Sequence, residues 1–484
     1  MTITSEQLLA LSPLLVLASG AAALMLCIAY RRQHDLVFAV TALTLIATIA
    51  ALLPASRAAS PEVSSLLLLD RYALFFIGLA CLAGLATMLP CRAYLAARSS
   101  EPEEFYILLL TTTLGAGVLA ASRHFAGLFL GLEILSVSLF PMIAYPRRDN
   151  RALEAGMKYL VLSGVSSAFL LFGIALIYAA TGVLDFARIT PPATPDPALL
   201  AGVVMVVAAL GFKLSLAPFH LWTADVYEGA PAPVGALLAT LSKGAVFALL
   251  FRYGLDTAMP WQPRLLDVLM LLAGLSILVG NLSALRQSNL KRLLAYSSIA
   301  HMGYLMIAPI ALGRVDATLA AESMCFYLAA YYATTLAAFG VITVLSTGRS
   351  DVDELHEYTG LFWTRPWLAG LMTIALLSLA GIPLTAGFVA KFYLFTTGAQ
   401  GAFWVLLSLM IVGSGLGLYY YVRVIYEMIQ PATSEPGTTT VAWGARLSLG
   451  VLGLLVLVIG VAPATLINFL RPLSQPVHIE EADR

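Results

Sequence analysis

Charged residues that lie inside apolar stretches are the first candidates for chemistry in this sequence. Glu133, Lys158, Lys213, Lys243 and Lys391 all lie within such stretches. A charge at this depth of a membrane costs several kcal/mol and therefore needs a protein or water partner. A lysine removed from water can release its proton, whereas an arginine keeps its proton. We therefore interpret the four lysines as proton carriers and Glu133 as their counter-charge.

A structural role is the alternative for each of these residues. A buried lysine can form a static ion pair that holds two helices together, or it can extend its ammonium group to the membrane surface. This alternative applies most to Lys158, which lies near the start of its apolar stretch. It applies least to Lys213, Lys243 and Lys391 taken together, because a structural role would have to account for a buried lysine in each of three separate apolar stretches.

Two histidines extend the set of candidate proton-transfer residues. His220 follows a proline inside an apolar stretch, and His301 lies in the segment AYSSIAHMGYLM. A neutral imidazole both accepts and donates a proton, which suits a relay. A lone histidine in an apolar helix is equally often a hydrogen-bonded packing residue. His301 lies where a link from Lys243 to Lys391 is needed, and this position favours the relay.

The composition identifies the elements that hold these residues as membrane helices. Hydrophobic residues make up 60% of the 484 residues, charged residues make up 11%, and the mean hydropathy is +0.89. Apolar stretches of about twenty residues, the length that crosses a bilayer, recur along the whole chain. The sequence therefore predicts an all-α integral membrane protein with about fourteen transmembrane helices. The expected spans are 8–30, 35–53, 70–90, 104–121, 124–145, 155–180, 198–224, 229–254, 264–285, 291–312, 317–346, 366–398, 402–429 and 443–470.

Charge and cysteine content exclude some classes of site. The formal net charge of +0 argues against a basic nucleic-acid-binding surface. The four cysteines are scattered and form no CxxC pair, so the sequence predicts no zinc or iron–sulfur centre. The one long polar insert, at 347–365, is predicted to be an amphipathic loop or surface helix.

Arginine and lysine residues gather in alternate loops, after the first, third, fifth, ninth and eleventh spans. Positive residues near helix ends mark the cytoplasmic side of a membrane. We therefore expect these loops in the cytoplasm and both chain termini outside. The residues concerned are Arg31, Arg32, Arg92, Arg98, Arg147, Arg148, Arg151, Arg286, Lys291, Arg292, Arg349 and Arg365.

Two of the expected spans contain helix-breaking residues. Pro218 lies in the seventh span, and Gly381, Pro383 and Gly387 interrupt the twelfth. Proline removes a backbone hydrogen bond, and freed backbone groups are tolerated only beside a cavity or water. The two broken spans are the seventh and the twelfth, an offset of five spans. Because this offset is odd, the helix units around them have opposite orientations in the membrane, which is typical of inverted transporter repeats. We predict a three-helix N-terminal segment (1–100), two inverted five-helix repeats (101–258 and 259–430), and a C-terminal helix with a tail (431–484).

Four long segments carry a resemblance to a known family. They are GLEILSVSLFPMIAY, GFKLSLAPFHLWTADVYEGAPAPV, LKRLLAYSSIAHMGYLM and AGIPLTAGFVAKFYLF, within roughly residues 100–430. The chain resembles the antiporter-like subunits of respiratory complex I and their relatives, the multisubunit cation/proton antiporters and membrane-bound hydrogenases. The antiporter-like subunits of complex I differ among themselves at two of these features. Lys391 and the short stretch after the last span favour one of these subunit types over the others.

The resemblance implies a proton-translocating subunit in the membrane arm of an NADH:quinone oxidoreductase of the bacterial inner membrane. Glu133 and Lys213 match the family's glutamate–lysine pair, Lys243 its central lysine and Lys391 its terminal lysine. The family implies no cofactor in this chain, so NADH, flavin, iron–sulfur clusters and quinone are expected on partner subunits. The expected partners are the other membrane-arm subunits, lipid and protons. A cation/proton antiporter subunit and a structural subunit that conducts nothing remain alternatives.

Overall fold

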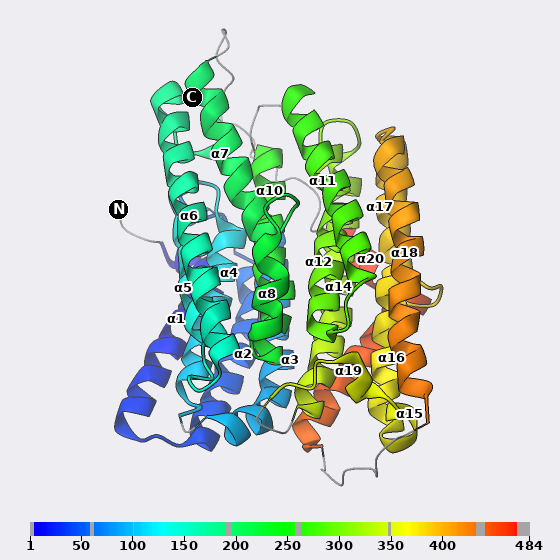
Figure 1. The fold of residues 1–484 in the computed structure, drawn as a ribbon. Helices are drawn as coiled ribbons and strands as arrows, with labels where there is room; N and C mark the ends of the chain where they lie inside the picture. The colour runs from blue at the N-terminus through cyan, green and yellow to red at the C-terminus, as the bar shows by residue number, and fades with distance from the viewer. Residues whose placement is uncertain are drawn as a thin grey trace.

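The computed structural model describes residues 4–58, 62–99, 101–189, 196–256, 263–346, 350–431 and 441–471. Within these ranges the chain is helical with isolated backbone bridges and no β-strand. The long helices stand side by side (Figure 1). The all-α membrane architecture predicted from the sequence is confirmed. The elements are α1 (Ser5–Tyr30), α2 (His34–Ala55), α3 (Arg71–Arg98), α4 (Glu104–Ala121), α5 (Phe125–Ile143), α6 (Asn150–Thr181), η1 (Phe186–Arg188), α7 (Pro197–Leu214), α8 (Leu221–Gly229), α9 (Ala232–Leu237), η2 (Leu238–Ser242), α10 (Lys243–Asp256), α11 (Pro263–Ala284), α12 (Leu290–Leu305), α13 (Ile307–Ala311), α14 (Ala317–Leu345), η3 (Leu355–Tyr358), α15 (Leu361–Thr364), α16 (Pro366–Ala380), α17 (Ala386–Gln400), α18 (Trp404–Ile429), α19 (Trp443–Val461) and α20 (Pro463–Leu470).

The membrane spans follow the predicted positions closely. In the described residues, 13 helical segments are long and apolar enough to cross a membrane. The span expected at 366–398 is instead two helices of 15 residues each, α16 and α17. The seventh expected span is likewise divided into α7 and α8. The total of fourteen crossings stays a prediction.

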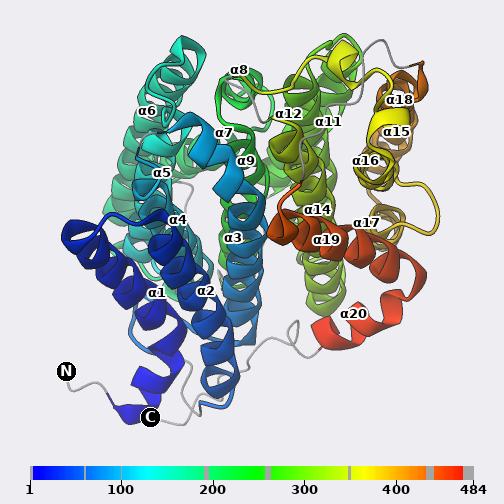
Figure 2. The ribbon, with the colours of Figure 1, turned by 90° about the horizontal axis from the view of Figure 1, so that it is seen from below.

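The helices are arranged around a central group. Seen from below, α1 and α2 lie at one edge of the molecule, and α3 lies near the middle (Figure 2). Helix α3 packs against both α4 and α14, and α19 packs across α14, α16 and α17. Most side chains of α10, α12 and α14 are buried. The polar groups on these three helices must therefore find partners inside the protein.

The loops rich in arginine and lysine lie on one face, at the lower end of Figure 1, where α15 also lies. Arg32 and Arg147 pair with one glutamate at 3.7 and 3.8 Å, and Arg98 and Lys291 pair with one aspartate at 2.6 and 2.8 Å. The predicted grouping of these loops on one side is confirmed for these four residues. Arg349 lies outside the described residues. The assignment of this face, which we call the charged face, to the cytoplasm stays a prediction.

The predicted domain boundaries are not tested by the fold. Positions 100, 258 and 259 lie outside the described residues. The segment between α14 and α16 contains only two short helical turns, η3 and α15, in its described part. Leu355 and Tyr358 of this segment are buried. His356 and Glu357 of the same turn are exposed, so the segment is an amphipathic loop packed on the charged face, one of the two expected forms, and not a surface helix.

Candidate functional site

The two helix breaks begin with the same helix-ending motif. Helix α7 ends before Ser215, whose φ is 60°, and α16 ends before Gly381, whose φ is 85°. In both breaks the next backbone N–H donates to a carbonyl five residues earlier, at 2.8 Å from Leu216 and 3.0 Å from Ile382. This is a helix-ending motif with a left-handed residue. The paired broken helices predicted from proline and glycine are present, and their inverted relation remains a prediction.

Lys213 lies in the last turn of α7, just before the first break. Its side chain is buried, and Nζ donates to the hydroxyls of Ser136 on α5 at 2.7 Å and Ser163 on α6 at 2.6 Å. Glu133, one turn before Ser136, accepts a hydrogen bond from Ser167 on α6 at 2.5 Å. Lys213 and Glu133 therefore bind different serines, and both contact α6, at Ser163 and Ser167 respectively.

The predicted pairing of Glu133 with Lys213 is indirect in this structure. No ion pair joins the two side chains, both of which belong to the described residues, although Glu133 lies within electrostatic range of Lys213. Glu133 is also partly exposed on the isolated chain, whereas Lys213 is buried. The serine hydroxyls let the lysine stay buried without a direct carboxylate partner.

Lys243 is the first residue of α10 and directly follows the π-helical turn η2. Its side chain is 1% exposed, and Nζ donates to Ser298 on α12 at 2.8 Å. The same hydroxyl accepts from Tyr331 of α14 at 2.8 Å, and the Tyr227 ring centroid lies 5.6 Å from Nζ. Single π-helical turns are frequent at functional positions. Here the turn precedes the lysine that joins α10 to α12.

His301 is surrounded by tyrosine hydroxyls from neighbouring helices. Nδ1 lies 2.7 Å from the Tyr327 hydroxyl of α14, and Nε2 lies 3.4 Å from the Tyr421 hydroxyl of α18. Tyr421 also hydrogen-bonds to Ser297, one turn before the histidine. Both ring nitrogens thus face groups that can donate or accept a proton. His301 was predicted, but the two tyrosines were not.

Lys391 caps the end of α16 from the far side of the second break. Nζ donates to the carbonyl oxygens of Leu379 at 3.0 Å and Ala380 at 2.8 Å, and the Tyr304 ring centroid lies 5.4 Å away. The last carbonyls of a helix have no partner within it, and a cation beside them is favourable. His301 lies within electrostatic range of Lys391.

His220 and Lys158 lie apart from these contacts. His220 is half-buried in the loop that follows the first break, and its Nδ1 is buried without a hydrogen-bond partner in the described structure. Lys158 forms ion pairs with Glu154 at 2.8 Å and Asp225 at 2.9 Å, and its side chain is 41% exposed. Asp225 also pairs with Arg292. Lys158 thus belongs to the charged face, and the structure does not bring it together with the buried lysines.

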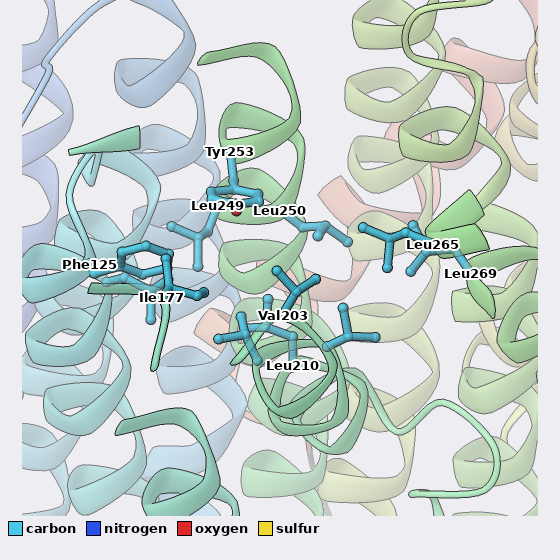
Figure 3. Close-up of a pocket in the computed structure, with 12 residues that line it drawn as sticks. Phe125, Ile177, Val203, Leu210, Leu249, Leu250, Tyr253, Leu265 and Leu269 are labelled. Atoms are coloured by element: carbon cyan, nitrogen blue, oxygen red, sulfur yellow. The ribbon is translucent and has the colours of Figure 1, made fainter. Parts of the chain in front are cut away.

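A small apolar cavity lies among α5, α6, α7, α10 and α11 (Figure 3). It has a volume of about 30 Å³ and is lined by apolar side chains of α5, α6, α7, α10 and α11, together with Tyr253. Leu210 lies one turn before Lys213, and Leu249 and Leu250 lie beyond Lys243 on α10. Water needs two to four polar partners to occupy such a space. The apolar lining of this cavity therefore offers water few polar partners.

Comparison with known proteins identifies the family. The family model described as "NADH:quinone oxidoreductase/Mrp antiporter, TM" matches residues 122–417. The chain is 50% identical over 476 residues to NADH-quinone oxidoreductase subunit N of Methylococcus capsulatus, with 98% of this chain and 96% of the relative covered. The chain belongs to the NADH:quinone oxidoreductase/Mrp antiporter family. The resemblance inferred from the four segments is confirmed, as is the closer likeness to subunit N that Lys391 indicated.

Further members of the NADH:quinone oxidoreductase/Mrp antiporter family agree with this assignment. Subunit N of Ectopseudomonas mendocina is 48% identical over 494 residues, covering 98% of this chain and 97% of the relative. A chain of respiratory complex I from Thermus thermophilus superposes with a TM-score of 0.82 at 34% identity, covering 95% of this chain and 99% of that one. A chain of the Mrp complex from Dietzia has a TM-score of 0.84 at 19% identity, covering 98% and 97%, and shows the fold alone. The chain is a multi-pass protein of the bacterial inner membrane.

Proposed function

We propose that this chain is a proton-translocating subunit in the membrane arm of an NADH:quinone oxidoreductase. Protons move along Glu133, Lys213, Lys243, His301 and Lys391. Redox chemistry in partner subunits drives the movement, and NADH, flavin, iron–sulfur clusters and quinone bind to those partners. The other membrane-arm subunits and the lipid bilayer surround this chain.

One observation carries this proposal. In the described residues, Lys213, Lys243 and Lys391 have hydroxyl or carbonyl oxygens as partners of Nζ, and none of the three has an ion pair. An ammonium group held by neutral oxygens can give up its proton without leaving an unpaired buried carboxylate behind. A purely structural lysine gains more from a carboxylate partner, as Lys291 does with Asp351. The three lysines therefore suit reversible protonation.

The direction of transfer is inferred from the side chains around Lys213 and Lys243. The apolar side chains around the small cavity oppose direct release of a proton from Lys213 or Lys243 to the opposite face. The contact from Lys243 to Ser298 leads instead to α12, which carries His301, and from there to Lys391 at the second break. A change in the distance between Glu133 and Lys213 is the proposed trigger. It alters how strongly the ammonium form of Lys213 is held.

Replacing Lys213 or Lys391 with methionine tests the proposal. Methionine keeps much of the side-chain length and the helix propensity but carries no proton. We expect each variant to assemble in near-normal amounts and to translocate protons at least about tenfold more slowly, as expected for the loss of a proton-transfer group. Proton uptake into inverted membrane vesicles during NADH oxidation measures the effect. Unchanged translocation in both variants would contradict the proposal, and reduced assembly alone would favour the structural alternative.

Replacing His301 and its neighbour Tyr421 separates proton transfer from packing. His301→Gln keeps a polar side chain that cannot exchange a proton, and we expect proton translocation to fall at least about tenfold. Tyr421→Phe keeps the ring but removes one hydroxyl, and we expect a smaller decrease of about two- to fivefold, because Tyr327 still holds His301. Initial rates of proton uptake at matched amounts of assembled complex provide the measurement. A larger loss in Tyr421→Phe than in His301→Gln would contradict the relay through the histidine.

A cation/proton antiporter subunit is the alternative function. It would use nearly the same residues, and the likeness to the Mrp complex is limited to the fold at 19% identity. Purification of the tagged chain in mild detergent, followed by a native gel stained for NADH oxidation, distinguishes the two functions. A large NADH-oxidising assembly supports the proposal. A smaller assembly without that activity, together with sodium-dependent proton exchange in vesicles, would support the antiporter.

A further inference from the structure

The charged face contains a buried ion cluster that the proposed proton path does not use. Its centre is Asp351, whose side chain is 6% exposed. One carboxylate oxygen accepts from Arg98 at 2.6 Å and from the Tyr94 hydroxyl at 2.8 Å. The other accepts from Lys291 at 2.8 Å and from the backbone N–H of Ala232 at 3.0 Å. The carboxylate thus binds α3, α9 and α12 at the same time.

The cluster holds the chain on both sides of Pro231. Lys291 donates to the carbonyl oxygen of Ala230 at 3.0 Å, while Asp351 accepts from Ala232. Pro231 has no N–H of its own, so the backbone at this junction between α8 and α9 depends on its neighbours for hydrogen bonds. The cluster therefore determines where α9 begins relative to α12.

The span that begins with α9 also contacts α12 further along, at the proposed proton path. Ala232 to Asp256 form one continuous buried span, in which Lys243 lies eleven residues after Ala232. At 1.5 Å per residue this is about 16 Å, roughly half of the hydrocarbon core. On α12, Ser298 lies two turns after Lys291. Side chains tilt toward the N-terminus of their helix, so Lys243 reaches back to meet Ser298 at 2.8 Å.

We propose that Asp351 is a positioning residue for proton transfer: by tying the start of α9 to the start of α12, it sets the contact between Lys243 and Ser298. Buried ion clusters are best established as devices that hold helices in one register. A span packed on all sides transmits a shift at one end to the other, because close-packed interiors do not absorb it. The inference rests on the proposed function, since it concerns the rate at which Lys243 passes on its proton.

The charges of the cluster are maintained in spite of burial. Burial by itself disfavours the charged carboxylate, but Lys291 and Arg98, with hydrogen bonds from Lys291 and Tyr94, lower the pKa of Asp351 below its ordinary value. A cavity of about 1320 Å³ at the charged face borders the cluster and is lined by Asp351, Lys291, Arg98 and Ala230, among others. The cluster therefore lies between solvent and the helix that carries Lys243.

Proton translocation by an Asp351→Asn variant tests the inference. Asparagine keeps the shape and the hydrogen bond from Ala232 but loses the charge that holds Lys291 and Arg98. We expect less assembled complex, because Lys291 and Arg98 stay buried without this carboxylate. In the complex that does assemble, we expect at least about fivefold fewer protons translocated per NADH oxidised, because small displacements at a transfer site are costly. Asp351→Glu should recover part of the loss. The matched control is Glu357→Gln, on the same segment, whose exposed carboxylate caps its own turn at the backbone of Glu354.

A double variant distinguishes positioning from general support of the fold. If Asp351 acts through Lys243, then Asp351→Asn combined with Lys243→Met will translocate no fewer protons than Lys243→Met alone. Additive losses, or an Asp351→Asn variant with normal translocation, would overturn the inference. If Asp351→Asn fails to assemble, Tyr94→Phe is used in its place in the double-variant comparison. This substitution removes one hydrogen-bond donor to the Asp351 carboxylate. Normal translocation by Lys243→Met would contradict the proposed function itself.

Discussion

Replacing Lys243 with methionine will lower proton translocation more than any other single substitution in the row of buried lysines. The Lys243 side chain is 1% exposed, and its contact with Ser298 joins α10 to α12. Without an exchangeable proton at this position, the hydrogen bond that joins α10 to Ser298 of α12 is lost. We expect a loss of about a hundredfold, within the range that a positioned acid–base group contributes. Methionine fits a buried site without an unpaired charge, so assembly should be retained.

Replacing Lys243 with arginine provides the decisive control for that experiment. Arginine keeps the positive charge but does not release its proton. If Lys243 acts as a proton carrier, the arginine variant will assemble and remain as defective as the methionine variant. Proton uptake into vesicles and NADH oxidation, both measured per assembled complex, provide the comparison. Translocation at the normal rate with arginine would mean that only the charge is needed.

Replacing Arg252 with methionine will have the largest effect on stability. Arg252 binds Asp70 through two nitrogens at 2.6 and 3.1 Å and also donates to the carbonyl of Ala120. The two charged side chains are 4% and 13% exposed. Removing one partner of such a buried pair leaves an uncompensated charge and costs about 3–5 kcal/mol. We expect a sharp fall in the amount of chain found in the membrane and in assembled complex.

A double variant tests whether the unpaired charge is the cause of that loss. Asp70 also caps α3 by accepting from the backbone N–H of Ala73 at 2.9 Å, and asparagine can make the same hydrogen bond. Asp70→Asn combined with Arg252→Met should therefore recover much of the protein amount and of the midpoint temperature of dissociation. Equal losses in the single and double variants would show that Arg252 acts through its packing, for example on Tyr72 at 5.0 Å.

Some of the site could be predicted because its signals are local. Pro218 and Gly381 lie at or next to the two helix breaks, because neither a proline nor a left-handed glycine continues a helix. The burial of Lys213 and Lys243 followed from the apolar residues around them. These features depend on neighbours in the sequence, which is why composition and spacing were sufficient to find them.

Other parts of the site depend on which helices face one another. Lys158 has an apolar neighbourhood like that of Lys213, yet it lies among the ion pairs of the charged face. Lys291 lies at a helix boundary as expected, at the start of α12, but its side chain is buried against Asp351. Tyr421 of α18 was not predicted, but its hydroxyl lies beside His301. Buried tyrosine hydroxyls need partners, and this requirement is a signal that could have drawn attention to it.

The sequence by itself determined that this chain is a helical membrane protein, where most of its spans lie, where two of them break, and to which family it belongs. Apolar stretches of bilayer length and helix-breaking residues act locally, so they can be recognised from the sequence alone. Only the tertiary structure decided that Lys213 is held by serines rather than directly by Glu133, and that Asp351 ties α9 to α12. A hydrogen-bond partner is selected by the rotation and depth of separate helices, which side chains far apart in the sequence determine together.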